Sequence, residues 1–363
     1  MSDIRITNCH IHTFTAQHVP ENFPFPGAKY IRNNPGVILV LAWAARSLGQ
    51  EQLSEQLQRL YQFQQQGARE SQQEILNDVV KHYPGDTRFV ILPMPMQGIG
   101  FGSVPVSLQA QHDELARMRD AANPPGSVLP FATVDPRDPR SVRECLRALV
   151  DLKFKGLKIY PRLGFAPDHP ELMQKIYPLV DRLGLPVMTH CSRGGVQGND
   201  VCDYTGDGFT RPAAYLPVLR DFPRLRLCLA HFGGQVDWAA YVNASETRGG
   251  ENWMEQIRDM ISSGRYPNLW ADISYTLFQF DDFAPILRLL LSGTGDPSKR
   301  LRRRVLFGSD FYMTRQEKLS ERAVSIRLRD ALGEVLFEQI AQINPEVWLD
   351  ERDEDKTLWT GQG

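Results

Sequence analysis

The chain has 363 residues, of which 42% are hydrophobic, 10% aromatic and 23% charged. This composition is that of a globular protein with a large buried core, and it excludes a disordered chain. The 41 basic and 43 acidic residues are mixed along the sequence and leave a formal charge of −2, so we expect no nucleic acid and no membrane surface as a partner.

The N-terminal sequence, the length of the apolar runs and the cysteine count indicate the cellular compartment. The N-terminus has no signal-peptide pattern, and no apolar run approaches the ~18 residues of a bilayer span. Five cysteines, an odd number without C-x-x-C spacing, argue against a disulfide framework. We therefore expect a cytoplasmic protein with reduced thiols.

Short apolar runs rich in β-branched residues recur along the chain, most followed by a loop and a segment of helical periodicity. Eight runs are predicted as strands: residues 4–9, 88–95, 127–134, 154–160, 185–191, 225–232, 268–275 and 304–311. Helices are predicted over residues 107–122, 138–152, 169–184, 251–263 and 283–293. From the second strand on, strands begin 27 to 43 residues apart, which is the length of one strand plus a crossover helix and predicts a parallel sheet.

Eight such units predict an α/β fold, a (β/α)8 TIM barrel. An open doubly wound sheet is the alternative, although no G-x-G-x-x-G motif follows a predicted strand. The interval between the first two strands is longer and holds a Pro-rich loop, an apolar patch over 36–45 that also fits a strand, and a Gln-rich helix over 49–83. We interpret residues 15–85, approximately, as a cap inserted over the barrel mouth. The cap belongs to one domain of residues 1–349, and a polar tail follows over 350–363.

Ionisable residues fall at the ends of several predicted strands. In a parallel barrel alternate strand residues point inward, and catalytic residues collect at the C-terminal ends. Counting in steps of two puts Ile4 and Ile6 in the interior and brings His10 and His12 to the mouth. The same count, which places Leu227 and Leu229 in the interior, brings four more residues to strand ends: Lys158, His190, His231 and Asp310. It turns Cys9, Cys191 and Cys228 toward the surrounding helices.

This convergence predicts a divalent metal site. Imidazoles and a carboxylate meeting at one point are ligands for zinc, our first expectation, with manganese or iron as alternatives. The competing interpretation is that each histidine is a hydrogen-bonded interior residue. Four of the chain's eight histidines lie at such strand ends, which favours the metal site.

The pattern resembles the amidohydrolase-2 branch of the amidohydrolase superfamily, which includes aminocarboxymuconate-semialdehyde decarboxylase, resorcylate-type decarboxylases and several lactone and amide hydrolases. The matching motifs are CHIH (9–12), GLKIYP (156–161), LPVMTHCSRGG (185–195), LAHFGG (229–234) and LFGSDFY (306–312). The resemblance runs from Ile4 to about Asn344 and is weakest over residues 15–85.

The resemblance implies roles for these residues. His10, His12, His190 and Asp310 match metal ligands. His231 matches a residue that is a second-metal ligand in some members and a general acid or base beside one metal in decarboxylating members. Lys158 occupies the position that carries a bridging carbamate in two-metal members, and we favour one ion over two.

The expected chemistry leaves three functions open. Asp310 would accept a proton from an activated water, and His231 would polarise or protonate the substrate. The first function is a hydrolase acting on an amide, ester or lactone of a small acidic metabolite. The second is a non-oxidative decarboxylase of an aromatic or dienoic acid, and the third is an inactive binding barrel.

Loops after the strands supply the candidate substrate contacts, which are Tyr160, Arg162, Arg193 and Tyr312. The arginines indicate an anionic small molecule. The Gly-rich loop over 192–209 fits either a mobile flap or an ordered turn. Family members are often homodimers, but the sequence identifies no exposed apolar helix as an interface.

Overall fold

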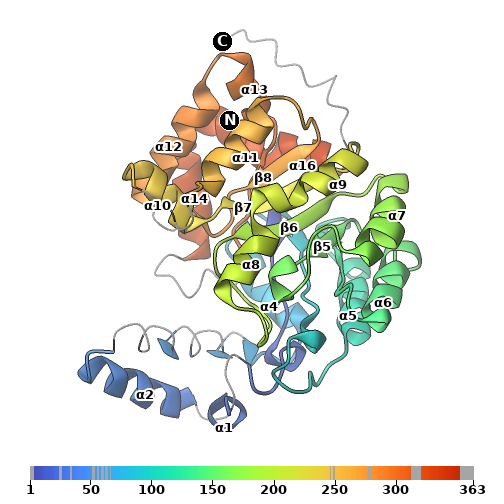
Figure 1. The fold of residues 1–363 in the computed structure, drawn as a ribbon, viewed down its shortest axis with the longest axis vertical. Helices are drawn as coiled ribbons and strands as arrows, with labels where there is room; N and C mark the ends of the chain where they lie inside the picture. The colour runs from blue at the N-terminus through green and yellow to red at the C-terminus, as the bar shows by residue number, and fades with distance from the viewer. Residues whose placement is uncertain are drawn as a thin grey trace.

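The computed structural model describes residues 4–23, 27–32, 35–50, 54, 57–58, 61, 64–65, 67–245, 247, 250–276, 280–311 and 320–351. In this part of the chain parallel strands form a core that helices surround (Figure 1). The strands are β1 (Thr7–Ile11), β2 (Arg88–Ile91), β3 (Val128–Pro130), β4 (Ala132–Thr133), β5 (Leu157–Ile159), β6 (Val187–Ser192), β7 (Leu227–Gly233), β8 (Leu269–Asp272) and β9 (Val305–Leu306).

The strands form a closed ring. All paired strands are parallel, in the orders β1-β2-β3 and β4-β5-β6-β7-β8-β9. Only Phe131 separates β3 from β4, so these two pieces are one staggered strand. The ring closes between its ends, because the Cys9 N–H donates to the Phe307 carbonyl at 2.9 Å and the Asp310 N–H donates to the His10 carbonyl at 2.8 Å. Within the described residues the predicted parallel α/β fold is confirmed, and each of the eight predicted runs overlaps a strand.

Helices follow most strands, and several begin at a residue whose side chain caps the backbone. Ser71, Ser107 and Asn252 each accept a hydrogen bond from the N–H three residues later, which satisfies a donor that the helix leaves unpaired. The α-helices are α1 (Lys29–Arg32), α2 (Pro35–Ser47), α4 (Gln72–Val80), α5 (Leu108–Asp120), α6 (Pro139–Val150), α7 (Tyr177–Arg182), α8 (Asp203–Thr210), α9 (Leu216–Asp221), α10 (Gln235–Val242), α11 (Trp253–Ser262), α12 (Phe280–Ser292), α13 (Asp296–Arg302), α14 (Glu321–Leu332), α15 (Glu334–Glu338) and α16 (Asn344–Trp348). Short 3-10 or π turns are η1 (Ala16–His18), η2 (Met96–Gly98), η3 (Pro161–Leu163), η4 (Leu172–Ile176), η5 (Pro212–Tyr215) and η8 (Gln339–Ile343).

Two apolar layers lie on opposite faces of the strands. The larger one joins strand residues to the surrounding helices and includes Ile4 and Ile6. The smaller one takes its side chains from β1–β3, β6–β9 and the adjoining residues, with Trp348 of α16 added, and therefore fills the inside of the ring. Cys9 and Cys228 belong to this inner layer.

The prediction of which strand side chains point into the barrel is therefore wrong in part. Ile4, Ile6, Leu227 and Leu229 belong to the layer facing the helices, whereas the prediction placed them inside. Cys9 and Cys228 lie inside, whereas the prediction turned them outward. For Cys191 the prediction is confirmed, since it packs in the outer layer.

The histidines nevertheless reach the mouth, because strict alternation breaks at the strand ends. The register between β1 and β2 shifts between Asn8 and Ile11, which re-aims the residues between them. His231 and Asp310 have φ values of +68° and +60°, in the left-handed region that non-glycine residues rarely adopt. Such backbone conformations cluster at functional sites, and here they turn side chains toward the mouth.

The insertion between β1 and β2 differs from the expected cap. Residues 36–45, which also fitted a strand, belong to helix α2, and Figure 1 shows α1 and α2 extending away from the barrel. Ile38, Ala42 and Ala45 pack with Leu57 in a small core separate from that of the barrel. The predicted helix over 49–83 is described at its end as α4 and otherwise lies partly outside the described residues. A cap over the mouth is not shown by the described part of the insertion.

Two further expectations concern segments of the chain. The Gly-rich loop over 192–209 leads into α8, so its second half is helical. Among the described helices, none combines the length and apolar character that a transmembrane span requires.

Candidate metal centre

Three side chains from opposite ends of the chain meet at the C-terminal end of the barrel. The Nε2 atoms of His10 and His12 lie 3.3 and 3.1 Å from Oδ1 of Asp310. All three residues are buried. Two imidazoles and one carboxylate thus direct their ligand atoms at one point, as the sequence predicted.

The other ring nitrogen of each histidine is already engaged. His10 Nδ1 lies 2.7 Å from Oδ2 of Asp272, and His12 Nδ1 lies 2.7 Å from the carbonyl oxygen of Leu92. Because an acceptor oxygen requires the proton on Nδ1, Nε2 of each ring carries a lone pair. Carboxylate or carbonyl partners of this kind orient histidines that bind metals.

Unsatisfied polar atoms support a cation at this point. His10 Nε2 and Asp310 Oδ1 are buried and make no hydrogen bond with any described residue. Buried polar atoms in proteins nearly always have hydrogen-bond partners. The lone pair on His10 Nε2 and the facing Asp310 Oδ1 have none, so their placement requires an explanation. A divalent cation accepts electron pairs from both atoms, and the group of His10, His12, His231, Asp272 and Asp310 is consistent with such a site.

Asp272, at the end of β8, is the residue that the sequence analysis missed. Besides His10, its carboxylate accepts the backbone N–H of His231 at 2.8 Å and the Ser274 hydroxyl at 2.6 Å. The signal was present, because the run LWAD (269–272) also turns from apolar to ionisable at its last residue. Asp272 therefore ties β8 to both β1 and β7.

His231 and His190 lie beside this group and contact each other. Nε2 of His231 is 3.1 Å from Nδ1 of His190, and Nδ1 of His231 is 3.0 Å from the carbonyl oxygen of Ser274. Nε2 of His190 lies 3.1 Å from both the Ser192 hydroxyl and the Gly194 carbonyl. Both nitrogens of His190 thus have protein partners, and its predicted role as a metal ligand stays a prediction.

Burial fixes the charge states of the site. Burial, together with the Lys158 ammonium, lowers the pKa of His10 to about 3. Burial also lowers the pKa of His231. Burial opposes ionisation of Asp310, but its contact with His12 and the nearby His10 hold its pKa below the usual value. Near neutral pH the imidazoles of His10 and His231 are therefore neutral and the Asp310 carboxylate is ionised, which is the form that binds a cation.

Lys158, on β5, projects into the same region. Its Nζ atom is buried and has no hydrogen-bond partner in the part of the chain that the structure describes. Burial lowers the pKa of Lys158 to about 8, although Asp272 and Asp310 favour its charged form. The ammonium lies 5.8 Å from the centroid of the Tyr160 ring, a contact that leaves its N–H donors without hydrogen bonds.

The predicted substrate contacts have varied surroundings. Tyr160 stacks on His190, with ring centroids 4.3 Å apart, and its hydroxyl accepts the Val196 N–H. The Arg162 guanidinium pairs with Asp207 at 2.6 Å and Asp203 at 2.9 Å, which joins η3 to α8. The Arg193 guanidinium pairs with Asp237 at 2.9 Å and lies over the ring of Trp253. Tyr312 lies outside the described residues.

Both arginines thus have their charges matched within the protein. A guanidinium already held by carboxylates has less attraction left for an anionic substrate. A role for Arg162 or Arg193 in substrate binding stays a prediction, and the Lys158 ammonium has no carboxylate hydrogen-bonded to it.

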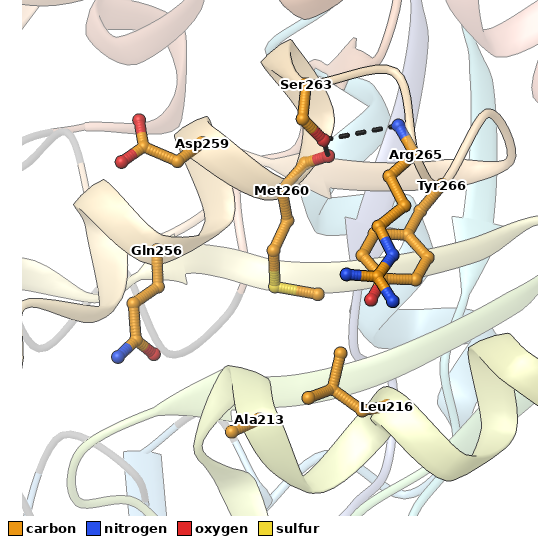
Figure 2. A pocket seen from close by; sticks show the side chains of 8 residues that line it. All are labelled: Ala213, Leu216, Gln256, Asp259, Met260, Ser263, Arg265 and Tyr266. Carbon is orange, nitrogen blue, oxygen red and sulfur yellow. Dashed lines mark hydrogen bonds between the residues drawn. The ribbon is translucent and has the colours of Figure 1, made fainter.

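A surface pocket elsewhere on the molecule has no part in this centre. The pocket has a volume of about 440 Å³. Figure 2 shows its lining residues, which come from η5, α9, α11 and the loop before β8. Its walls are Ala213, Leu216, Gln256, Asp259, Met260, Ser263, Arg265 and Tyr266. None of these residues belongs to the histidine and aspartate group, so the pocket gives no information about the reaction at that group.

Comparison with models of known protein families shows to which family the chain belongs. The family model described as amidohydrolase, for the amidohydrolase-2 branch, matches residues 8–350. The chain belongs to the amidohydrolase-2 family. No curated protein matches the chain significantly.

Solved structures agree on the fold of this amidohydrolase-2 protein. An uncharacterized TIM-barrel protein from Bordetella bronchiseptica is 17% identical with a TM-score of 0.54, and the match covers 95% of this chain and 98% of that one. The 5-carboxyvanillate decarboxylase LigW from Sphingomonas paucimobilis is 15% identical with a TM-score of 0.53, over 96% and 99% of the two chains. At these identities the likeness establishes the TIM-barrel fold and no more.

In this amidohydrolase-2 protein we expect Asp272→Asn to weaken metal binding by about 10- to 100-fold, because removing a partner that orients a histidine ligand typically has that effect. The neutral amide would no longer fix the Nδ1 proton of His10 by charge. Competition with a chromogenic chelator measures the change. Asp296→Asn is the control, since it makes the same change at an exposed carboxylate outside this group. Unchanged affinity in Asp272→Asn would refute this role.

Proposed function

We propose that the protein is a metal-dependent hydrolase that cleaves an amide, ester or lactone bond of a small acidic metabolite. The observation that carries this proposal is the ionised Asp310 carboxylate, buried against the Nε2 atoms of His10 and His12. The potential metal ligands and the proton-accepting carboxylate thus lie together at the C-terminal end of the barrel. That placement matches the position of active sites in TIM-barrel enzymes.

His10, His12 and Asp310 would hold a divalent ion, with zinc as the first expectation and His190 and His231 as neighbouring candidates. Such an ion would supply Lewis-acid activation of a water at neutral pH. Asp310 would accept the proton released by that water, because its lowered pKa keeps it ionised. When the water oxygen bonds to the carbonyl carbon, the bond from that carbon to the leaving nitrogen or oxygen would break, and Asp310 would return the proton to that leaving atom.

Hydrolysis makes the smaller demand on His231. Burial lowers its pKa, so the ring is neutral near pH 7 and carries a single N–H proton. Its Nδ1 lies 3.0 Å from the Ser274 carbonyl oxygen and its Nε2 lies 3.1 Å from Nδ1 of His190. Decarboxylation requires a proton donor for the substrate carbon, whereas hydrolysis with Asp310 as the proton acceptor needs no proton from His231.

Lys158 supports an acidic substrate. Its unpaired Nζ atom is buried near the histidine group, and a substrate carboxylate would supply the missing partner. This role replaces the one that we expected of Arg162 and Arg193, whose charges are matched within the protein.

A non-oxidative decarboxylase is the second candidate, because LigW, which shares the fold over nearly its whole length, is a 5-carboxyvanillate decarboxylase. Product analysis separates the two functions. Reconstituted protein would be supplied with a panel of lactones, amides and esters of small acids, and with aromatic and dienoic acids. Incorporation of one oxygen from ¹⁸O-labelled water into an acid product supports the hydrolase. Release of CO2 without water addition would replace that proposal with the decarboxylase.

The number of ions is tested by Lys158→Ala. We favour one ion, since the two groups of potential ligand atoms, one completed by His12 with Asp310 and the other by His231 with Asp272, share His10. The variant should then bind the same number of metal equivalents as the parent protein, measured by elemental analysis after dialysis. Loss of one of two equivalents would establish the bridging carbamate instead. Lys175→Ala, at an exposed ion pair on η4, is the control.

A further inference from the structure

The candidate metal centre lies across the seam at which the barrel ring closes. His10 belongs to β1, on one side of this seam, and Asp310 follows β9, on the other. Within the described residues β1 and β9 share no strand ladder, and a single bridge pairs Ile11 with Phe311. The separation of the two potential ligands therefore depends on individual contacts across the seam and not on a regular ladder.

Asn8 bends β1 just before the first of these ligands. Its Oδ1 atom accepts the backbone N–H of His10, two residues further on, at 3.2 Å. An asparagine side chain that bonds the backbone two residues ahead forms a turn of its own, which competes with the strand ladder. The register between β1 and β2 shifts at this place, between Asn8 and Ile11. The Asn8 side chain thus accounts for the local bend that aims His10 at the mouth.

Ser309 makes the same kind of contact on the other side of the seam. Its hydroxyl oxygen accepts the backbone N–H of Phe311, again two residues ahead, at 3.2 Å. Asp310 lies between these two residues with a φ of +60°, a left-handed conformation that a non-glycine residue keeps only where its surroundings hold it. A polar side chain thus closes a local turn at His10 and another at Asp310.

The two turns are bonded to each other. The Ser309 N–H donates to Oδ1 of Asn8 at 3.1 Å, and Nδ2 of Asn8 donates to the Ser309 hydroxyl at 2.9 Å. Both side chains are buried, so water does not compete for these bonds. We refer to Asn8 and Ser309 as the seam pair.

Tyr83 and Glu321 fix the orientation of the Asn8 amide. The Tyr83 hydroxyl accepts an N–H of this amide at 3.0 Å and donates its own proton to Oε1 of Glu321 at 2.6 Å. Burial and the Glu321 carboxyl raise the pKa of Tyr83 well above its usual value, so the phenol keeps this proton. The Asn8 amide thereby uses both of its donors and accepts two hydrogen bonds, which is its full capacity. Any rotation of the amide would break several of these bonds at once.

We propose that Asn8 is a positioning residue of the metal centre, because the seam pair sets the separation of His10 from Asp310 and with it the affinity for a divalent ion. The inference rests on the metal centre of the proposed function, and it holds for hydrolysis and for decarboxylation alike. Metal–ligand distances vary by only about ±0.2 Å, so a small widening of the seam weakens binding. The seam is tightly packed at this place, since a Cβ atom on Gly308 would lie 2.7 Å from Cβ of His10.

The competing interpretation is that this buried network only stabilises the fold. Loss of a hydrogen bond would then lower the stability of the metal-free protein and leave the affinity for the ion unchanged. A positioning role lowers the affinity beyond any change in stability. Metal affinity and the unfolding temperature of the metal-free protein are therefore measured on the same variants.

The first experiment compares Tyr83→Phe with Tyr177→Phe. Both variants remove the hydroxyl of a buried tyrosine, but the Tyr177 hydroxyl on α7 donates to the Pro167 carbonyl and has no contact with the seam pair. We expect Tyr83→Phe to weaken zinc binding by roughly 3- to 10-fold, less than the 10- to 100-fold typical of a direct partner of a ligand, because it acts through Asn8. Tyr177→Phe should keep the parent affinity. Competition with a chromogenic chelator gives both values.

The second experiment changes the seam pair itself. Asn8→Ala should weaken zinc binding by about 10- to 100-fold and change the visible absorption spectrum of bound cobalt(II), which depends on the arrangement of the ligands. Asn268→Ala is the matched control, since it removes an amide that donates to the Pro223 carbonyl before β7, and its cobalt spectrum should be that of the parent. If Asn8→Ala does not fold, the comparison of the two tyrosine variants decides the question.

The outcomes separate this inference from the metal centre on which it rests. Parent affinity and an unchanged cobalt spectrum in Asn8→Ala and Tyr83→Phe would overturn the inference and leave the metal centre in place. An equal loss of affinity in Tyr83→Phe and Tyr177→Phe would also overturn it, because the effect would then follow general stability. A parent protein that binds neither zinc nor cobalt would overturn the metal centre and this inference together.

Discussion

Replacing Asp310 by Asn is expected to lower turnover by roughly 10³-fold or more, since the carboxylate is both a metal ligand and the group that transfers the proton. The amide is nearly the same size and can keep the backbone contact between Asp310 and β1, so the fold should survive. The rate would be measured on the substrate that the product screen identifies, with circular dichroism as the check on folding.

The control for this variant is Asp296→Asn, which removes an exposed carboxylate at the start of α13. It should leave turnover unchanged. Near-normal activity of Asp310→Asn, with folded protein and a full complement of metal, would contradict the role that we assign to this carboxylate.

His12→Ala is expected to reduce affinity for a divalent cation by at least about 100-fold, because it deletes a ligand and not merely a group that orients one. The Nδ1 contact with the Leu92 carbonyl would also be lost, but Phe14 and the neighbouring apolar residues keep the strand end buried. Elemental analysis after dialysis against a weak chelator gives the metal content. His169→Ala, at a partly exposed histidine before η4, should keep the metal content of the parent protein.

If His12→Ala retained a stoichiometric ion at parent affinity, the three-ligand centre would be wrong. An ion held by His10, His231 and Asp272 would then be the alternative, since these residues also have ligand atoms close together. In the structure, however, the Ser274 hydroxyl lies 3.0 Å from Nδ1 of both His10 and His231. That hydroxyl occupies the space between them and favours the point defined by His10, His12 and Asp310.

The positions of the strand ends were accessible to sequence reasoning because an apolar run that turns ionisable is a local pattern. His10, His12, His231 and Asp310 were found in this way, and the structure brings them together. Their orientation was not accessible by the same rule. The register shift in β1 and the left-handed backbone at His231 and Asp310 break the two-residue period, and both depend on contacts between strands that are distant in sequence.

Other features depended on tertiary contacts in the same way. Asp272 has the same local signal as Asp310, but its importance comes from the two strands that it joins. Arg162 and Arg193 looked like anion-binding residues until the acidic partners on α8 and α10 were in place. The apolar run over 36–45 fitted a strand because strands and buried helices share such runs, and its exposure on an arm is visible only in three dimensions.

The position of a bound ion tests the account most directly. Crystals of the protein reconstituted with zinc would be measured on both sides of the zinc absorption edge, so that the anomalous difference map locates the ion. We predict one peak about 2.0–2.1 Å from Nε2 of His10 and of His12 and bonded to Asp310. A zinc peak bound by other residues, or a fully reconstituted protein in which these three side chains hold no ion, would contradict it.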